Sequence, residues 1–525
     1  MQARPFPLAT RSSTATARPR LALNMGTCGL ALGSIEVREQ LRQPAEDRFD
    51  LIEAGCDGGC FQAPAVTIQN ASGETRRLLL PATAGVQELL DQVGEASSEP
   101  SSEADFYPRQ KRSLLANCGV IDATSIDRAL ERGAYRGLWR ALSEITPEAV
   151  IDDVEASELR GRGGAYFPTG RKWRSARDYP GAHYVVVNAE EGEPAVFKDR
   201  HLMEGDPHLL LEGLLIAGYA VGASRGFIYI NGLARLSRIR IDRAIEQARQ
   251  RGIFGEHVLG SDFAFDVELR SGAGGYVLGE ESVLLNSIEG HRSVPRTRPP
   301  YPVEAGLWAS PTVINNVETL CNVTMIMREG VAKFREGAGP NGAGTKLVSL
   351  SGAVRRPGLV EVAMGATMRE IVFGIGGGAA EGKQIIGVLA GGPSGGFLSL
   401  ESLDTPARPG ALHGSGAVLG SGGLVVLDDS LPIVEIVRHL TEYNRNESCG
   451  KCTPCREGTD QMLEILTRAT VGAAGEADLE RLVFLGDVAT NASLCGLGQM
   501  APNPITSALN QFEQEFRAAF RTDNH

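Results

Sequence analysis

Four cysteines near the C-terminus have the types and spacing that an iron-sulfur cluster needs. Cys449, Cys452 and Cys455 follow one another as C-x2-C-x2-C, and Cys495 comes forty residues later. Three thiolates on a tight turn can bind three corners of one [4Fe-4S] cluster, and a distant fourth cysteine can complete it. Zinc sites favour paired C-x2-C units, and simple burial gives no reason for even spacing. The pattern therefore favours [4Fe-4S] over a zinc knuckle or buried free thiols.

A second group of cysteines lies near the N-terminus. Cys28 stands in a glycine-containing turn, and Cys56 and Cys60 are separated by three residues. The segment resembles the thioredoxin-like [2Fe-2S] ferredoxin domain, whose second cysteine pair has this spacing. A [2Fe-2S] cluster needs four ligands, and the local sequence offers three, with Asn24 near the place of the first. We expect either a cluster here or a structural domain that no longer binds one.

Composition and charge limit the function classes. The chain has 525 residues, 42% hydrophobic and 22% charged, and a formal net charge of -12. Phosphate backbones require clustered lysine and arginine, so a nucleic-acid partner is not expected. The grouped cysteines are typical of metal sites in a reducing compartment, and we expect no disulfides. No signal-peptide core and no run of roughly eighteen apolar residues occurs, which predicts a cytoplasmic protein, soluble or peripheral on a membrane complex.

A glycine-rich stretch at residues 159–173 could approach a phosphate closely. Arg162, Arg171 and Lys172 add positive charge to it. The dinucleotide fingerprint G-x-G-x-x-G fails, because Tyr166 stands at its third glycine position. Taken alone, the segment fits an ordinary glycine-rich turn and a cofactor-binding loop equally well.

Three further segments combine glycine, amide and acidic side chains. Residues 188–194 follow an apolar strand expected at 183–187, residues 271–281 form a second glycine loop ending in paired acids, and residues 315–319 add two asparagines. Carboxylates gathered at the end of a strand make a poor core and commonly line a ligand-binding edge. Each segment alone could be an ordinary surface loop, but together they favour a binding site.

These blocks and the cluster cysteines, in this order over residues 111–500, resemble one family. It is the NADH-binding flavoprotein subunit of respiratory complex I (the F-type or 51 kDa-type subunit) and its relatives in NAD-linked formate dehydrogenases and hydrogenases. The resemblance implies the cofactors FMN, NAD(H) and [4Fe-4S]. The implied FMN contacts are Gly161, Arg162, Gly163, Lys172, Asn188, Glu190, Tyr276, Gly279, Glu280, Asn315 and Asn316, and the implied nicotinamide-nucleotide contacts are Phe167, Glu193, Glu281, Arg298 and Tyr301.

The sequence departs from the family at several positions. Tyr166 stands where the family usually has glycine, and Ala195 and Val196 stand where it has Gly-Thr. Glu190 replaces a typical aspartate, and Ser175 takes the place of a second nucleotide-stacking aromatic residue. These departures bear on the strength and selectivity of nucleotide binding.

The chain as a whole is predicted to be a multidomain α/β protein. N-terminal patterns predict helices at 36–43 and 83–93 and strands at 49–53 and 65–69. Residues 347–351 and 423–427 read as strands, and residues 431–443, 458–469, 477–489 and 505–520 carry apolar residues at helical spacing. The expected layout is a disordered tail (1–20), a thioredoxin-like ferredoxin-type domain (21–94), a linker (95–106), a Rossmann-like FMN/NADH domain (107–343), a β-grasp, soluble-ligand-binding domain (344–430) and a four-helix [4Fe-4S] domain (431–525).

The implied activity is that of an NADH dehydrogenase (diaphorase) subunit, which passes electrons between NAD(H), FMN and a [4Fe-4S] cluster. The protein would set the nicotinamide against the flavin, with no catalytic side chain beyond the cofactors. Expected partners are other iron-sulfur subunits, including a separate [2Fe-2S] thioredoxin-like subunit. The fused N-terminal domain favours a soluble formate dehydrogenase or hydrogenase over complex I, and the absence of a cysteine after Cys495 argues against the extra ferredoxin tail of electron-bifurcating hydrogenase subunits.

Two other function classes remain open at this stage. A non-catalytic electron-transfer or assembly subunit would keep the cysteines without binding flavin. A ligand- or DNA-binding regulator would need a basic recognition face, against which the net charge argues.

Overall fold

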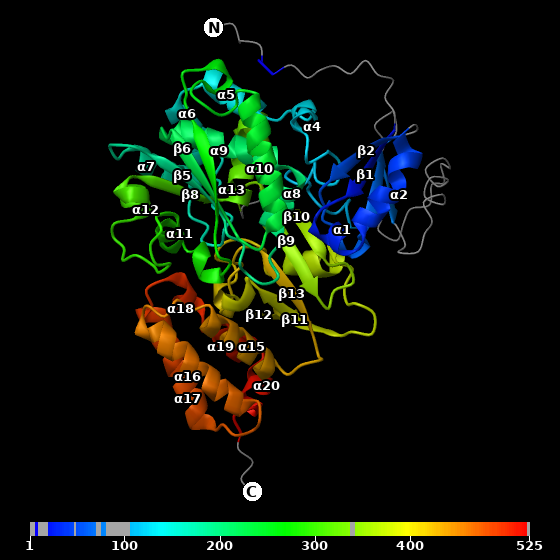
Figure 1. Cartoon of the computed structure of the whole chain (residues 1–525). Coiled ribbons are helices and arrows are strands. Elements are labelled where there is room, and N and C mark those ends of the chain that lie inside the picture. The colour runs from blue at the N-terminus through cyan, green and yellow to red at the C-terminus, as the bar shows by residue number, and fades with distance from the viewer. Residues whose placement is uncertain are drawn as a thin grey trace.

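The computed structural model describes residues 6–8, 19–46, 49–69, 75–79, 106–336 and 342–521 (Figure 1). The helix predicted at 83–93, nearly all of the predicted linker and most of the predicted N-terminal tail lie outside these residues. Within the described part of the chain, no helix is both long and apolar enough to cross a membrane.

The N-terminal sheet (residues 20–79) has the strand order β2-β1-β3-β4, with β1 parallel to β2 and antiparallel to β3. Leu21 and Leu23 of β1 pack with Leu41, whereas Ala22 packs with Ile52. Successive side chains of a strand point to opposite faces, so both faces of β1 are covered. The predicted strands and first helix occur here. The elements are β1 (Arg20–Asn24), α1 (Thr27–Ala31), α2 (Ser34–Glu46), β2 (Asp50–Ala54), η1 (Cys60–Gln62), β3 (Ala65–Gln69) and β4 (Thr75–Leu79).

The parallel-sheet region (residues 106–336) is built on four parallel strands in the order β7-β6-β5-β8. The strand predicted at 183–187 is β5. The strands are β5 (Tyr184–Ala189), β6 (Arg225–Ile230), β7 (Asp266–Ser271) and β8 (Thr312–Asn316). The helices are α4 (Ile126–Glu131), α5 (Arg136–Glu144), α6 (Pro147–Ala156), α7 (Thr169–Arg177), α8 (Lys198–Gly205), α9 (Pro207–Val221), α10 (Arg235–Gln250), η2 (Val258–Gly260), η3 (Tyr276–Gly279), α11 (Glu281–Ile288), α12 (Pro302–Ala305), η4 (Leu307–Ala309), α13 (Val317–Glu329) and α14 (Val331–Arg335).

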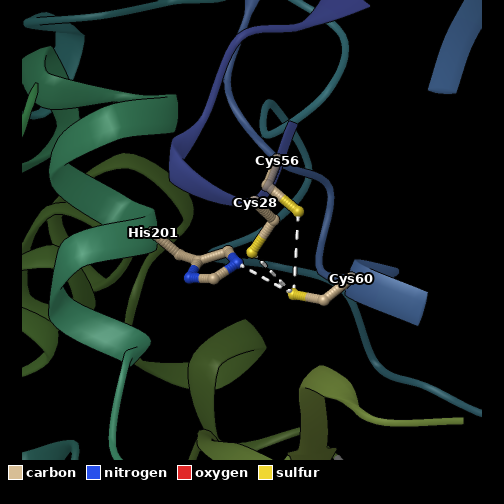
Figure 2. Close-up of side chains that lie close together, drawn as sticks. All are labelled: Cys28, Cys56, Cys60 and His201. Carbon is tan, nitrogen blue, oxygen red and sulfur yellow. Dashed lines mark hydrogen bonds between the residues drawn. The ribbon is translucent and has the colours of Figure 1, made fainter. Parts of the chain in front are cut away.

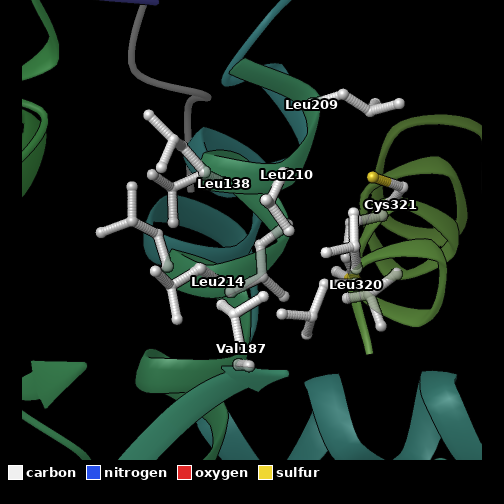
Figure 3. Close-up of a cluster of buried hydrophobic side chains, with 14 of the residues drawn as sticks. Leu138, Val187, Leu209, Leu210, Leu214, Leu320 and Cys321 are labelled. Atoms are coloured by element: carbon white, nitrogen blue, oxygen red, sulfur yellow. The ribbon is translucent and has the colours of Figure 1, made fainter. Parts of the chain in front are cut away.

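Helix α9 is the centre of this region. It is apolar around nearly its whole circumference and is almost entirely buried, as expected for a helix covered on all sides. At Gly213 a Cβ atom would lie 2.1 Å from the carbonyl oxygen of Leu320, so glycine is what allows α9 and α13 to approach so closely. Figure 3 shows Leu210 and Leu214 of α9 between Leu138 and Leu320, with Val187 of the sheet nearby.

The carboxyl ends of the parallel strands meet at one edge of this sheet. Asn188 of β5 is paired with Asn316 of β8, and Asn188 also neighbours Tyr229 of β6. Ligands of open α/β sheets bind outside the carboxyl ends of the strands. The segments that the sequence analysis singled out at 188–194, 271–281 and 315–319 all begin or end at this edge.

The mixed-sheet region (residues 342–428) contains five strands in the order β10-β9-β13-β11-β12. Strands β9 and β13 are parallel, and the other neighbours are antiparallel. Both strands predicted here, at 347–351 and 423–427, are confirmed. The elements are β9 (Thr345–Gly352), β10 (Gly358–Ala363), η5 (Glu370–Ile375), β11 (Ile385–Ala390), η6 (Gly392–Ser394), β12 (Gly396–Ser399), η7 (Leu400–Ser402), η8 (His413–Ser415) and β13 (Gly423–Asp428).

The C-terminal helical region (residues 433–518) packs beneath the mixed sheet (Figure 1). All four predicted helical segments are helical, but the prediction of four helices was wrong. The last segment breaks at Phe512, whose φ of -135° and ψ of 38° leave the helical range. The Phe512 ring packs edge-on against Phe397 of β12, 6.1 Å between centroids, and this contact with the sheet replaces helix continuity. The helices are α15 (Ile433–Asn446), α16 (Thr453–Ala469), α17 (Glu476–Ala492), α18 (Gly496–Met500), α19 (Asn503–Gln511) and α20 (Glu513–Ala518).

Candidate flavin, nucleotide and iron-sulfur site

The first glycine loop reaches the carboxyl edge of the parallel sheet. The Gly161 N–H donates to the carbonyl of Phe167, 2.9 Å, which closes the loop ahead of α7. A Cβ atom at Gly163 would lie 3.1 Å from Cβ of Asn316, so this glycine admits the end of β8. The loop therefore lies at the strand ends, where the sequence analysis expected a cradle.

Arg162 ties this loop to the mixed sheet. Its side chain is 1% exposed and donates to the carbonyl oxygens of Arg160, Ala343 and Thr345 at 2.9 to 3.1 Å. Burial lowers the pKa of the guanidinium despite the Glu318 charge nearby. These carbonyls use donors of the side chain, and the Arg162 backbone N–H donates to Thr319 Oγ1, 2.9 Å, so Arg162 can serve a flavin site by holding the loop in place.

Tyr166, which departs from the family pattern, is accommodated in two ways. Its φ is 52°, in the left-handed region that favours glycine. The side chain is 7% exposed and belongs to the hydrophobic cluster of the mixed-sheet region, together with Val348 and Leu419. Tyrosine thus replaces a flexible turn with a packed contact between the two regions.

The predicted asparagines are held by a network of buried polar groups. Asn188 Nδ2 donates to the carbonyl of Gly279, 2.8 Å, and Asn315 Oδ1 accepts from Trp173 Nε1, 2.8 Å. Asn316 Nδ2 donates to a carboxylate oxygen of Asp199, 2.6 Å, and its Oδ1 accepts from the Lys198 ammonium, 2.9 Å. Trp173, Lys198 and Asp199 therefore fix the side chains that the sequence analysis placed at the flavin.

Glu190 is a buried acid with an unused oxygen. Its side chain is 9% exposed, Oε1 accepts from Asn231 Nδ2 at 2.6 Å, and Oε2 has no partner. Burial raises the pKa of Glu190 to about 7, although hydrogen bonds from the Gly275 backbone and Asn231 oppose the shift. An orphaned buried oxygen at a strand end is the feature expected of a ligand-binding position.

A chain of alternating charges joins the predicted flavin and nucleotide residues. Lys172 Nζ donates to Glu281 Oε1, 2.9 Å, and to the carbonyl of Ile314, 3.0 Å. Arg298 pairs closely with Glu280 and lies 3.9 Å from Glu281. Burial acts to raise the pKa of Glu281, but the Lys172 charge and hydrogen bond bring the pKa below its usual range. The charges of these groups are largely compensated within the site.

The remaining predicted nucleotide residues line a more open part of the site. The side chains of Phe167 and Tyr301 are 47% and 51% exposed, so each presents a large aromatic surface to solvent. Glu193 accepts a hydrogen bond from Ser421 of the mixed-sheet region, its Oε1 is buried without a partner, and burial raises its pKa. An exposed aromatic ring can stack on a base, and an unsatisfied carboxylate can accept a hydrogen bond from a ribose.

Tyr276 connects the flavin residues to the cysteine turn. Its N–H donates to Glu447 Oε2, 2.7 Å, and its ring lies edge-on to Tyr443, 6.1 Å between centroids. Glu447 comes just before the cysteine motif, and Lys451 within the motif donates to the carbonyl of Pro295, 2.5 Å. The cluster turn and the site are therefore held against one another.

Three of the four C-terminal cysteines lie at the starts of two helices, and Cys449 precedes the first of these helices. Cys452 and Cys495 are the N-cap residues of α16 and α18, and Cys455 lies in the first turn of α16. A Cβ atom at Gly498 would lie 2.8 Å from Cβ of Cys455, so α18 reaches the motif through a glycine. Burial raises the pKa of Cys495 to about 11, with Glu280 and Cys449 adding to the shift. Helix N-termini favour the anionic thiolates that a cluster requires.

Sequence reasoning missed several residues of this network. Ser421 comes from the mixed-sheet region, which was assigned no chemistry. Glu447 opens the cysteine stretch but was given no role, and Lys198 and Asp199 were not among the predicted site residues. The position of Glu447, beside the cysteines, is the one local signal that could have pointed to it. The N-terminal cysteines also come together, with Cys28 Sγ and Cys56 Sγ lying 3.4 Å and 3.9 Å from Cys60 Sγ.

The residues present fit both cofactors. Gly161, Gly163 and Gly164, the orphaned Glu190 oxygen and the asparagines at the strand ends are residue types that could hold a flavin, and the four C-terminal thiols match a [4Fe-4S] ligand set.

Comparison with known proteins agrees with this geometry. Residues 154–325 match the Nuo51 FMN-binding domain, and residues 435–519 match the NADH-ubiquinone oxidoreductase-F iron-sulfur binding region. NADP-reducing hydrogenase subunit HndC of Solidesulfovibrio fructosivorans is 44% identical over 78% of this chain and 84% of its own length. The F 2 subunit of NADH-quinone oxidoreductase of Rhizobium meliloti (strain 1021) is 44% identical over 77% of this chain and 96% of its own.

A solved structure is also similar over nearly the whole chain. It is an NAD+-reducing [NiFe]-hydrogenase in the H2-reduced state, 30% identical, which matches 98% of this chain and 86% of that chain with a TM-score of 0.66. Family models, relatives and structure agree with the site described above. The chain therefore belongs to the family of NADH-binding flavoprotein subunits that includes the F-type subunits of NADH-quinone oxidoreductase, and it is an NAD-dependent oxidoreductase subunit with FMN and a [4Fe-4S] cluster.

Proposed function

We propose that this chain is the diaphorase subunit of a soluble, cytoplasmic NAD-linked hydrogenase or formate dehydrogenase. The supporting observation is the N-terminal sheet. The hydrogenase structure matches 98% of this chain, whereas the Rhizobium meliloti F 2 subunit aligns with 77% of it. The sequence alignments with HndC and with the F 2 subunit cover nearly equal shares of this chain, 78% and 77%, so the structural match to the NAD+-reducing hydrogenase is what supports this assignment.

The regions of the fold support a specific layout. The N-terminal sheet has one parallel and two antiparallel strand pairs, which supports assigning 21–94 to a thioredoxin-like domain. We assign 107–343 to the Rossmann-like FMN/NADH domain, 344–430 to a β-grasp domain and 431–525 to the cluster domain. Other iron-sulfur subunits, among them a separate [2Fe-2S] subunit, would complete the complex.

The residues of this chain would position the flavin and the nucleotide, and their charges compensate one another within the site. When bound, FMN supplies the step between two-electron hydride chemistry and one-electron transfer to the cluster. Gly161 and Gly163 would admit the flavin, and Asn188, Glu190 and Asn316 would orient it at the strand ends. Phe167 and Tyr301 would stack the nucleotide, and Glu193 and Glu281 would accept hydrogen bonds from it. The remaining assigned contacts are Arg162, Lys172, Tyr276, Gly279, Glu280 and Asn315 for FMN, and Arg298 for the nucleotide.

The experiment for the assembly is purification of the native complex. We expect recovery from cytosol without detergent, together with a metal-dependent partner that reduces NAD+ with electrons from formate or hydrogen. Recovery only from the membrane fraction, with quinone-reducing subunits, would instead establish the second candidate, the F-type subunit of an NADH-quinone oxidoreductase. That candidate is favoured by the 96% coverage of the Rhizobium meliloti relative.

Glu193→Gln tests the nucleotide site. A carboxylate that accepts a hydrogen bond from the nucleotide contributes roughly 1.5 to 3 kcal/mol. We expect the apparent KM for NADH to rise about tenfold or more, with FMN content unchanged, because Glu193 is assigned to the nucleotide and not to the flavin. Steady-state kinetics with an artificial acceptor measure the KM, and acid-released flavin measures the content.

Glu256→Gln is the matched control, since Glu256 is exposed on the parallel-sheet region and outside the predicted site. Kinetics of Glu193→Gln that equal those of Glu256→Gln, at both limiting and saturating NADH, would remove Glu193 from the nucleotide site.

A further inference from the structure

Three cysteines of the N-terminal sheet converge with a histidine from a different region of the chain (Figure 2). The ligand atoms of Cys28, Cys56, Cys60 and His201 all lie within 4.8 Å of one another. Cys28 lies on α1, Cys56 follows β2, and Cys60 opens η1, whereas His201 lies on α8, 141 residues beyond Cys60. The fourth ligand that the local sequence lacked is thus supplied from the parallel-sheet region.

The ring of His201 is oriented as a metal ligand. Its Nδ1 lies 2.6 Å from the carbonyl oxygen of Phe197 on the preceding turn. A carbonyl only accepts, so Nδ1 carries a proton, and Nε2, 3.5 Å from Cys60 Sγ, is the ring nitrogen left to bind a metal. Metal-binding histidines characteristically donate their other ring N–H to a carbonyl or carboxylate in this way.

The spacing of the four atoms distinguishes one ion from a two-iron cluster. With bonds of about 2.3 Å to sulfur and about 2.0 Å to nitrogen, a tetrahedral ion places its ligand atoms about 3.5 to 3.8 Å apart. The three separations from Cys60 Sγ follow this pattern, at 3.4 Å to Cys28 Sγ, 3.9 Å to Cys56 Sγ and 3.5 Å to His201 Nε2, and the other three are no longer than 4.8 Å. In a two-iron cluster, ligands on different irons stand farther apart than ligands on one iron, because the metal–metal distance is added. The convergence of all four atoms therefore fits a single ion and not [2Fe-2S].

The cysteines of the [4Fe-4S] motif provide an internal comparison. Among the residues that the structure describes, no other set of three or more such side chains converges within reach of one ion, the C-terminal four included. A cubane holds its thiolates at separate corners, so wider spacing is expected there. The two groups of cysteines thus differ in geometry as two different kinds of metal site do.

A disulfide does not account for the convergence. The cysteines are free, and the shortest sulfur–sulfur separation, 3.4 Å between Cys28 and Cys60, is well beyond a bond of about 2.05 Å. A disulfide would also leave the third cysteine and the oriented histidine without a role.

The surroundings hold α8 against the N-terminal sheet independently of any ion. Glu204, one turn after His201, accepts from the Thr27 N–H at 2.8 Å and from its hydroxyl at 2.6 Å. Arg240 of α10 donates to the carbonyls of Met25 and Glu53 at 3.5 and 3.4 Å. His201 and Cys56 are buried, 3% and 1% exposed, and Cys28 and Cys60 are partly exposed, so the four ligands meet in a preformed contact at the edge of the interface.

We propose that Cys28, Cys56, Cys60 and His201 bind one tetrahedral metal ion, which fastens the N-terminal sheet to α8. Three thiolates and one imidazole are the donor set of structural zinc sites, so the ion is assigned as Zn²⁺. Zinc has no redox chemistry, and the site stabilises an interface instead of carrying electrons. Helix α8 also carries Lys198 and Asp199, which hold Asn316 at the assigned flavin contacts. The ion therefore braces a helix that the flavin site uses.

The test is zinc analysis of the full-length holoprotein. We expect about one zinc per chain in addition to the iron of the [4Fe-4S] cluster. Zinc-edge X-ray absorption, which does not detect flavin or iron, should give three sulfur neighbours at about 2.3 Å and one nitrogen at about 2.0 Å. His201→Ala should lose the nitrogen neighbour and release its zinc to a competing chelator at least tenfold more readily, with FMN and cluster signals retained.

His257→Ala, on an exposed histidine, is the control and should keep zinc at the wild-type level. The wild-type absorption spectrum keeps the proposal testable even if the His201 variant fails to fold. Absence of bound zinc, a shell without nitrogen, or equal zinc retention in both variants would overturn the proposal. Two additional irons per chain, with a reduced-state paramagnetic signal that Cys56→Ser removes, would overturn it in favour of a [2Fe-2S] cluster.

Discussion

Cys495→Ala is expected to abolish or shift the reduced-state paramagnetic signal of the [4Fe-4S] cluster and to lower the bound iron. The variant leaves three cysteines at the start of α16 and removes the one ligand that α18 brings to them. A missing thiolate exposes one iron of the cubane, which weakens the cluster. Flavin reduction by NADH should persist, because the assigned flavin contacts lie on the parallel-sheet region. Electron paramagnetic resonance and iron analysis measure the first effect, and flavin bleaching on addition of NADH measures the second.

The matched control is Cys321→Ala, since Cys321 lies on α13 and is buried in the core of the parallel-sheet region. This variant removes a thiol without removing a cluster ligand and should keep both iron and signal. An unaltered signal in Cys495→Ala would mean that another group completes the cluster.

Features fixed by local spacing were predictable from the sequence. The cysteine motif, the apolar strand that became β5 and the amphipathic helices of the C-terminal region depend on residues close together in the chain. The glycine loops were located for the same reason, since a glycine-rich turn is a local property. The comparisons confirm the family and the cofactors that these patterns implied.

Features that depend on contacts between distant segments were not predictable. Arg162 was expected near a phosphate, yet its donors are used by carbonyls at residues 160, 343 and 345. His201 belongs to no motif, and its role becomes visible only when α8 lies against the N-terminal sheet. The break at Phe512 likewise follows from packing on β12, because the helical periodicity continues through it. In each case the outcome depends on tertiary contacts that the local sequence pattern does not contain.

Glu318→Leu is expected to lower the free energy of unfolding by about 3 to 5 kcal/mol, the usual cost of breaking a buried ion pair. Glu318 is fully buried and lies 2.5 Å from the Lys346 ammonium and 3.1 Å from that of Lys198. It also accepts from the Leu347 N–H, 2.9 Å, and so joins α13 to β9 of the mixed sheet. Denaturant unfolding measures the loss, and Glu513→Gln, on an exposed helical pair, is the control expected to change stability little.

The double variant Glu318→Leu with Lys346→Met separates charge from packing. Burial lowers the pKa of Lys346 to about 8 even beside Glu318. Without Glu318 its pKa falls further, so the unfolded chain binds more protons than the folded one, and stability rises with pH. Glu318→Leu should therefore be more destabilised at pH 6 than at pH 9, and Lys346→Met should restore part of the stability and reduce this pH dependence. Equal losses at both pH values, or no recovery in the double variant, would mean that packing and the bond to Leu347, not the buried lysine, account for the effect.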